Sequence, residues 1–238
     1  MKKHTLLSDT AVFLLIVFLF IIPSFFVSAL VSAAGTGENV KSLFEGWSFP
    51  WYQILLAIIG ALILFFYYEK NESSSDEKPV KLAAASDAIW KRLVVFPVVF
   101  TFGMLFAVSL FCRFISEVTG LFDGEILVTK PAGFLQWSFC LINFLCAAFY
   151  EEVLYRFYFT DKLYDLIRKK LRWQWFIWIC EAAGLAVFAF AHLYMGWISV
   201  LNAALAHVFL RLCYKKNGHL WPCVAAHFLY NVISLILL

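Results

Sequence analysis

Three ionisable residues lie within one otherwise apolar stretch of the chain. The sequence from Ala147 to Phe159 reads AAFYEEVLYRFYF and contains Glu151, Glu152 and Arg156. An ionised side chain in hydrocarbon is costly unless it is paired or faces a polar cavity, so such residues mark a functional site by default. Carboxylates are among the groups that move protons in catalysis. The stretch therefore predicts a site with acid–base character.

Helical spacing separates the three residues into two groups. Glu152 and Arg156 are four positions apart and share one face of a helix, where they can form an ion pair. Glu151 points about 100° away from Glu152 at 3.6 residues per turn. We therefore predict that Arg156 neutralises Glu152 as structural support and that Glu151 faces a cavity. For this stretch alone, a stabilising charge cluster at a helix end is the alternative.

Two later apolar segments also carry polar groups of catalytic type. Phe188 and His192 are four positions apart in AVFAFAHLYMG, and His227 and Asn231 have the same spacing in WPCVAAHFLYN. A single histidine in a membrane segment more often serves packing or hydrogen bonding. Three segments with such groups are more informative than any one of them.

Composition predicts the fold class, an all-α polytopic transmembrane helix bundle. Hydrophobic residues make up 63% of the chain and charged residues only 15%, far from the averages of soluble domains. About 20 apolar residues cross a hydrocarbon core of roughly 30 Å. Seven spans fit the chain, at about 8–30, 51–68, 93–112, 136–158, 175–195, 197–214 and 219–238.

Basic residues predict the orientation of these spans. With the N-terminus inside and the C-terminus outside, most Lys and Arg, Arg211 among them, fall on or near the cytoplasmic side, as the positive-inside rule requires. Only Lys41, Arg113 and Lys130 fall outside. The net charge of +3 is then a topology signal, and no nucleic-acid partner is needed to explain it.

The spans divide into two predicted regions joined by a linker. Residues 1–68 form a two-span hairpin, 69–92 a polar cytoplasmic linker, and 93–238 a five-span core. The first span ends in LVSAAG, which resembles a signal-peptidase site. Its apolar run is longer than that of a usual signal peptide, so a retained span is favoured and cleavage after Ala33 or Ala34 is the alternative.

Depth in the bilayer allows the polar residues to meet. If the fourth, fifth and seventh spans are centred near residues 149, 186 and 228, then Glu151, His192 and His227 each lie within roughly 9 Å of the midplane at a rise of 1.5 Å per residue. His192 fits least well, because it requires its helix to begin slightly below the interface.

These residues carry a family resemblance. EEVLYR (Glu151 to Arg156) matches an EExxxR motif, FAFAH (Phe188 to His192) an FxxxH motif, and HFLYN (His227 to Asn231) an HxxxN motif. In this order, residues 140–235 resemble the CPBP or Abi intramembrane proteases, which include the prenyl-protein CAAX endopeptidases. His207 and Arg211 stand where we would expect small or apolar residues.

The resemblance implies a hydrolytic mechanism. Glu151, held with His192, would act as general base on a water molecule that attacks the scissile carbonyl. His227 and Asn231 would stabilise the oxyanion. Glu152 and Arg156 would support the helix and orient Glu151.

A metal-dependent mechanism is the alternative chemistry. Glu151, His192 and His227 together form a two-histidine, one-glutamate set that would suit catalytic zinc. The chain has no HExxH motif. Metal-free activation of water by glutamate is therefore favoured, and zinc stays open.

We predict an endopeptidase of the membrane plane that acts on a membrane-associated, lipidated or hydrophobic-tailed peptide or protein. Short loops and compact length favour the plasma membrane of a prokaryote. The alternative of another class is a non-catalytic membrane protein that uses the same polar cavity for binding or immunity. A proton-coupled transporter is a third possibility, disfavoured because no inverted repeat is visible.

Overall fold

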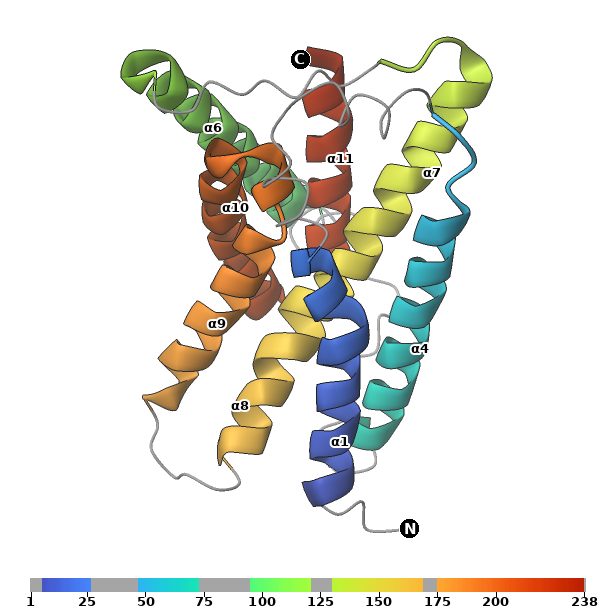
Figure 1. Cartoon of the computed structure of the whole chain (residues 1–238), viewed down its shortest axis with the longest axis vertical. Helices are drawn as coiled ribbons and strands as arrows, with labels where there is room; N and C mark the ends of the chain where they lie inside the picture. The colour runs from blue at the N-terminus through green and yellow to red at the C-terminus, as the bar shows by residue number, and fades with distance from the viewer. Residues whose placement is uncertain (1–5, 27–46, 73–94, 121–129, 169–174, 238) are drawn as a thin grey trace. The chain divides into compact units, whose positions relative to one another are not determined.

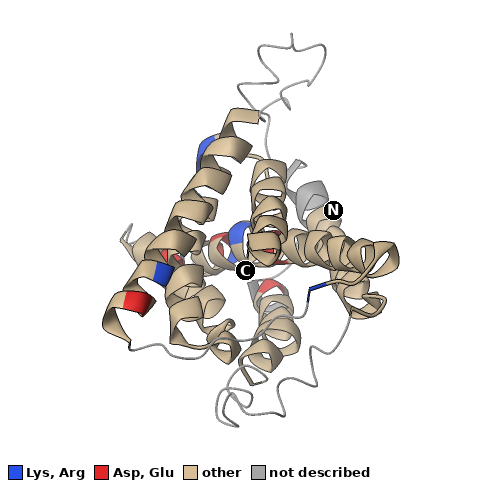
Figure 2. Cartoon of the chain, turned by 90° about the horizontal axis from the view of Figure 1, so that it is seen from above, with Lys and Arg blue, Asp and Glu red and all other residues tan. Residues whose placement is uncertain are grey.

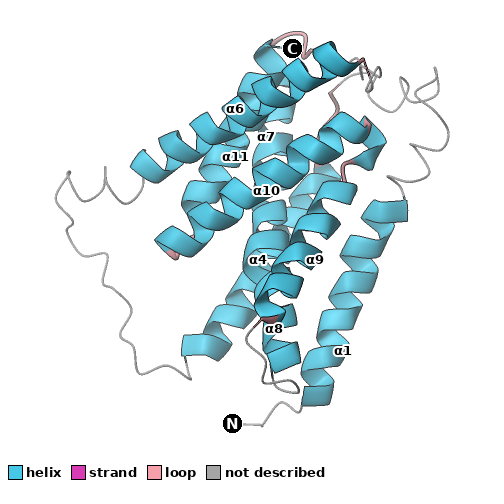
Figure 3. Cartoon of the chain, turned by 90° about the vertical axis from the view of Figure 1, so that its left-hand side faces the viewer, coloured by secondary structure: helices cyan, strands magenta, loops and turns pink. Residues whose placement is uncertain are grey.

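The computed structural model describes residues 6–26, 47–72, 95–120, 130–168 and 175–237. Within these ranges all regular structure is helical, and no strand occurs (Figure 3). The elements in chain order are α1 (Leu6–Ile16), η1 (Val17–Ile21), α4 (Trp51–Glu72), α6 (Phe96–Thr119), α7 (Phe134–Glu151), η4 (Glu152–Phe159), α8 (Thr160–Arg168), α9 (Phe176–Phe190), η5 (Leu193–Met195), α10 (Trp197–Asn217) and α11 (Trp221–Leu237).

The predicted class, a helical membrane protein, is confirmed. Four described helices are long and apolar enough to cross a bilayer, and the apolar helices at 51–66, 176–190 and 221–237 are shorter. Large apolar side chains such as Phe134 and Trp178 are exposed, as lipid-facing residues must be, and charged residues are sparse along the helices (Figure 2). The count of seven spans and the N-in, C-out orientation stay predictions.

The chain folds as two compact units that interleave along the sequence. Unit 1 comprises Met1–Glu45, Ala107–Val128 and Tyr158–Val208, and unit 2 comprises Gly46–Phe106, Thr129–Phe157 and Phe209–Leu238. This partition differs from the sequential division into hairpin, linker and core, which stays a prediction. The predicted linker lies outside the described residues except for its first four positions, which belong to α4. The possible cleavage site at Ala33 or Ala34 also lies outside them.

In unit 2, α7 packs against both α4 and α11 (Figure 1). Gly60 of α4 faces α7, and a Cβ there would make ordinary van der Waals contact with Phe149 and Tyr150. Phe149 in turn stacks on Trp221 of α11, with ring centroids 5.7 Å apart. These contacts on two sides place the C-terminal end of α7, where Glu151 lies.

In unit 1, α8 packs against α9 and α1 (Figure 1). Gly184 of α9 is required at this contact, because a Cβ there would clash with the hydroxyl of Thr160. On the α1 side, Phe13 stacks on Phe159 with ring centroids 5.7 Å apart. Asp9 and Lys162 are both buried, and their charged atoms lie 3.7 Å apart.

The Asp9–Lys162 pair predicts a stability effect. Asp9→Asn should lower the free energy of unfolding by about 3 kcal/mol, because it removes the carboxylate charge that lies 3.7 Å from a buried ammonium group. Unfolding in mixed micelles, followed by circular dichroism, measures the change. Glu117→Gln is the matched control: Glu117 pairs with Arg113 at an exposed position, where such pairs contribute at most about 1 kcal/mol. Equal effects of the two substitutions would contradict this prediction.

Candidate active site

The helix that carries the paired glutamates changes its hydrogen-bonding pattern at the motif itself. Residues Phe134–Arg168 are continuously helical, but α7 ends at Glu151 and η4, a π-helix, runs from Glu152 to Phe159. π-helical turns are rare and occur frequently at functional sites. The sequence analysis assumed α-helical geometry here, and no residue pattern in the stretch indicated otherwise.

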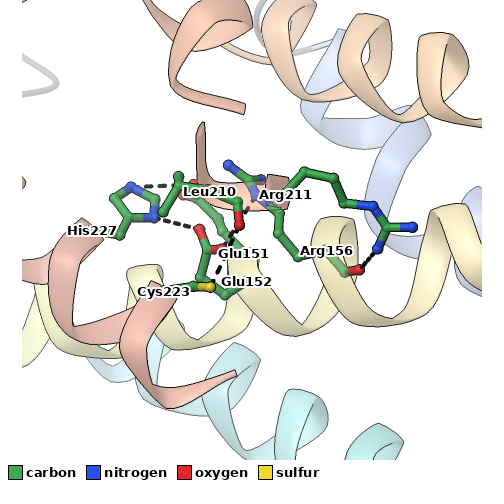
Figure 4. A network of polar contacts seen from close by, with 7 residues as sticks. All are labelled: Glu151, Glu152, Arg156, Leu210, Arg211, Cys223 and His227. Atoms are coloured by element: carbon green, nitrogen blue, oxygen red, sulfur yellow. Dashed lines mark hydrogen bonds and ion pairs between the residues drawn. The ribbon is translucent and has the colours of Figure 1, made fainter. Parts of the chain in front are cut away.

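Glu152 is fully enclosed in the site. Its side chain and that of Arg156 are both 0% exposed, and Arg156 Nε lies 3.2 Å from Glu152 Oε2. The other carboxylate oxygen, Oε1, lies 2.8 Å from His227 Nδ1 of α11. Each oxygen of Glu152 therefore has a nitrogen partner (Figure 4).

His227 lies between the two glutamates. Its second nitrogen, Nε2, is 3.9 Å from Glu151 Oε2. Because an ionised carboxylate only accepts hydrogen bonds, Nδ1 carries the proton shared with Glu152. The ring orientation is then fixed, and Nε2 faces Glu151 as an acceptor in the neutral ring or a donor in the imidazolium.

Glu151 and Asn231 complete the part of the site in unit 2. The side chain of Glu151 is 27% exposed, so Glu151, unlike Glu152, remains accessible. Asn231 follows His227 by one turn on α11 and is half-buried. An accessible carboxylate, a fixed imidazole and an amide on the same helix face as that imidazole are groups that can activate water and donate to an oxyanion.

His192 belongs to unit 1. It follows the C-terminal end of α9, and its backbone adopts φ −97° and ψ 6°, a sparsely occupied region in which many active-site residues lie. Its Nδ1 is 2.9 Å from the carbonyl oxygen of Phe188. A carbonyl accepts only, so Nδ1 is the donor and Nε2 is the acceptor of the neutral ring.

The FxxxH spacing has a local explanation. Phe188 supplies the carbonyl that accepts from His192, and its ring lies 4.8 Å from the imidazole centroid. On its other side Phe188 lies 5.6 Å from the ring of the buried His207. The phenylalanine therefore orients His192 through both its backbone and its ring.

Arg211 is a residue whose place the sequence analysis missed. The positive-inside rule predicts Arg211 on or near the cytoplasmic side, but the residue is only 5% exposed. Its Nη1 donates a hydrogen bond to the backbone carbonyl of Arg156 in η4. The one available signal was its position in the sixth span, where a small or apolar residue is expected.

The cofactor predictions stay predictions. Within the described ranges, no three His, Cys, Asp or Glu side chains form a group that could hold a metal ion. Of the zinc set named above, Glu151 and His227 lie in unit 2 and His192 in unit 1. His227 donates a hydrogen bond from Nδ1 to the carboxylate of Glu152. Metal-ligating histidines are oriented by the same kind of hydrogen bond from the ring nitrogen that does not bind the metal.

Comparison with protein families addresses this arrangement directly. Residues 133–233 match the family model described as Type II CAAX prenyl endopeptidase Rce1-like. This region is similar to the CAAX protease family. Comparisons with curated proteins and with solved structures found no match.

The matched region contains all six residues of the predicted site, from Glu151 to Asn231. It also contains Arg211, whereas α1, α4 and α6 precede it. The chain is therefore an integral membrane protein with a region similar to a protease family, and the buried charges near its glutamates lie inside that region.

Proposed function

We propose that the chain is an intramembrane endopeptidase that hydrolyses a peptide bond in a membrane-associated, lipidated or hydrophobic-tailed substrate. The observation that carries the proposal is the placement of His227 between the accessible Glu151 and the enclosed Glu152, within a region similar to a protease family. A purely structural charge cluster needs no accessible carboxylate beside a histidine that is already paired.

Glu151 and His192 act on the water molecule. Glu151 takes a proton as the water oxygen attacks the scissile carbonyl carbon, and the proton then passes to the leaving amine as the C–N bond breaks. The nitrogen of His192 that is available to the water molecule is Nε2, because Nδ1 donates a hydrogen bond to the carbonyl oxygen of Phe188. The family resemblance supplies this pairing of Glu151 with His192.

His227 and Asn231 stabilise the tetrahedral oxyanion. Because Nδ1 of His227 already donates to Glu152, the ring can donate from Nε2 only when it is protonated on both nitrogens. Asn231 adds an amide N–H from the same helix face.

The proposed substrate approaches from the membrane. The predicted topology places the motifs within the bilayer, and the proposed location is a prokaryotic plasma membrane. Peptides recovered from membranes and medium of cells with the gene, without the gene and with Glu151→Ala test the function. Cleavage products present only with the wild-type gene support it. A phenotype that survives Glu151→Ala would instead support the non-catalytic binding or immunity role.

Metal removal separates the two hydrolytic mechanisms. We expect cleavage by the purified protein to survive a strong zinc chelator and to proceed without stoichiometric zinc, because the proposed base is Glu151 itself. Metal analysis of the same preparation provides the second measurement. Loss of activity with chelator and its return with added zinc would favour the set of Glu151, His192 and His227 as ligands.

A further inference from the structure

Arg211 is a buried charge that the proposed mechanism does not use. It lies on α10 and donates to the backbone carbonyl of Arg156, within the π-helical segment that carries Glu152. The guanidinium Cζ also lies 5.6 Å from the ring centroid of Tyr214, within the range of a cation–π contact. A buried arginine with defined partners on two elements is a costly feature that calls for a role.

The end of α10 around Arg211 is attached to the site at two further points. The ring of Tyr214 meets that of Phe157 of η4 edge to face, with centroids 6.3 Å apart. The thiol of Cys223, one turn before His227 on α11, lies 3.5 Å from the carbonyl oxygen of Leu210. Arg211 thus lies in a part of α10 that contacts η4, which carries Glu152, and α11, which carries His227.

Arg211 also affects the charge of the cluster. Glu151 and Glu152 bring two negative charges when ionised, and Arg156 alone brings one positive charge. The guanidinium of Arg211 brings the second, so the four groups are balanced when His227 is neutral. Burial of unbalanced charge is costly, which gives Arg211 an electrostatic effect in addition to its hydrogen bond (Figure 4).

We propose that Arg211 is a positioning residue for the peptidase site: it holds the backbone of Arg156 and thereby the Glu152 carboxylate that orients His227. The order of contacts is Arg211 to the Arg156 carbonyl, Arg156 Nε to Glu152 Oε2, and Glu152 Oε1 to His227 Nδ1. The kinetic part of this proposal rests on the proposed function, whereas the structural part does not.

Kinetics of four purified variants in lipid vesicles test the proposal. Arg211→Met keeps much of the side-chain volume but removes the charge and the donors, and it should lower kcat about 100-fold with little change in KM, since displacement of a catalytic group can have an effect of this size. Arg211→Lys keeps the charge and a donor and should recover part of the loss. Arg113→Met and Arg113→Lys, at an exposed position of α6, are the matched controls and should leave kcat unchanged.

The ¹⁵N NMR spectrum of the histidine side chains provides a measurement that does not depend on cleavage. The wild-type protein should show a hydrogen-bonded Nδ1–H signal assigned to His227 by its absence in His227→Asn. Arg211→Met should shift or broaden that signal, Arg211→Lys should restore it in part, and the Arg113 variants should not affect it.

The two measurements distinguish failure of the proposal from failure of the function. A wild-type protein that cleaves no substrate contradicts the proposed function, while the His227 signal still tests whether Arg211 orients the ring. An unchanged His227 signal and unchanged kcat in Arg211→Met would overturn the positioning role. So would equal losses in the Met and Lys variants that follow a loss of folded protein.

Discussion

Glu151→Gln is expected to lower the cleavage rate by about 10³-fold or more. The amide has nearly the same size as the carboxyl group but cannot accept the proton of the attacking water, and general-base catalysis contributes roughly 10²–10⁴-fold. The side chain of Glu151 is 27% exposed, and its Oε2 lies 3.9 Å from His227 Nε2. The substitution should therefore leave folding nearly intact. Single-turnover cleavage of a substrate in lipid vesicles measures the effect on chemistry.

Glu117→Gln is the control for this substitution. It makes the same chemical change on an exposed face of α6, so wild-type turnover is expected. Turnover near the wild-type rate in Glu151→Gln would instead reject Glu151 as the base. If that result were accompanied by a large loss in Glu152→Gln, the two glutamates would have to exchange their assigned roles.

His227→Asn is expected to lower kcat by about 10²–10³-fold, the effect of removing one oxyanion donor. The asparagine amide can occupy the region of Nδ1 and still donate to Glu152, whereas nothing replaces Nε2. The variant therefore separates the orienting bond from the catalytic nitrogen. Steady-state kinetics together with unfolding in mixed micelles provide the two measurements, with a large loss expected only in the first.

A double variant tests whether His227 and Glu152 act as one unit. Glu152→Gln weakens the bond that orients the imidazole, so its effect on kcat should largely disappear once His227 is already Asn. His219→Asn, at an exposed position before α11, should have no effect. Independent, multiplying losses in the double variant would contradict the proposed coupling.

The helical segments could be predicted from composition, but their ends could not. The predicted span 136–158 corresponds to a helix that continues to Arg168. The basic and apolar residues after position 159 predict an amphipathic segment on the cytoplasmic membrane surface. Lys162 is instead buried beside Asp9, which lies 153 positions earlier in the chain (162 − 9). A pairing of this kind depends on tertiary packing, which hydropathy does not contain.

The candidate site shows the same division between local and distant information. The spacing of four residues predicted that Glu152 and Arg156 share a helix face. In the structure, Arg156 Nε lies 3.2 Å from Glu152 Oε2. The bond between Glu152 and His227 was not predicted, because it depends on the rotation of α11 against α7. The burial of Arg211 likewise depends on a contact between distant segments, its hydrogen bond to the carbonyl of Arg156.

The long helix from Phe134 to Arg168 has a consequence for the membrane around it. Its 35 residues would extend about 52 Å at 1.5 Å per residue, whereas the hydrocarbon core is roughly 30 Å thick. Tilt, bending or protrusion must absorb this hydrophobic mismatch. The π-helical segment η4 lies near the middle of this helix, and its backbone hydrogen bonds depart from the α-helical pattern. We therefore expect bilayer thickness, set by the length of the lipid acyl chains, to influence the turn that carries Glu152.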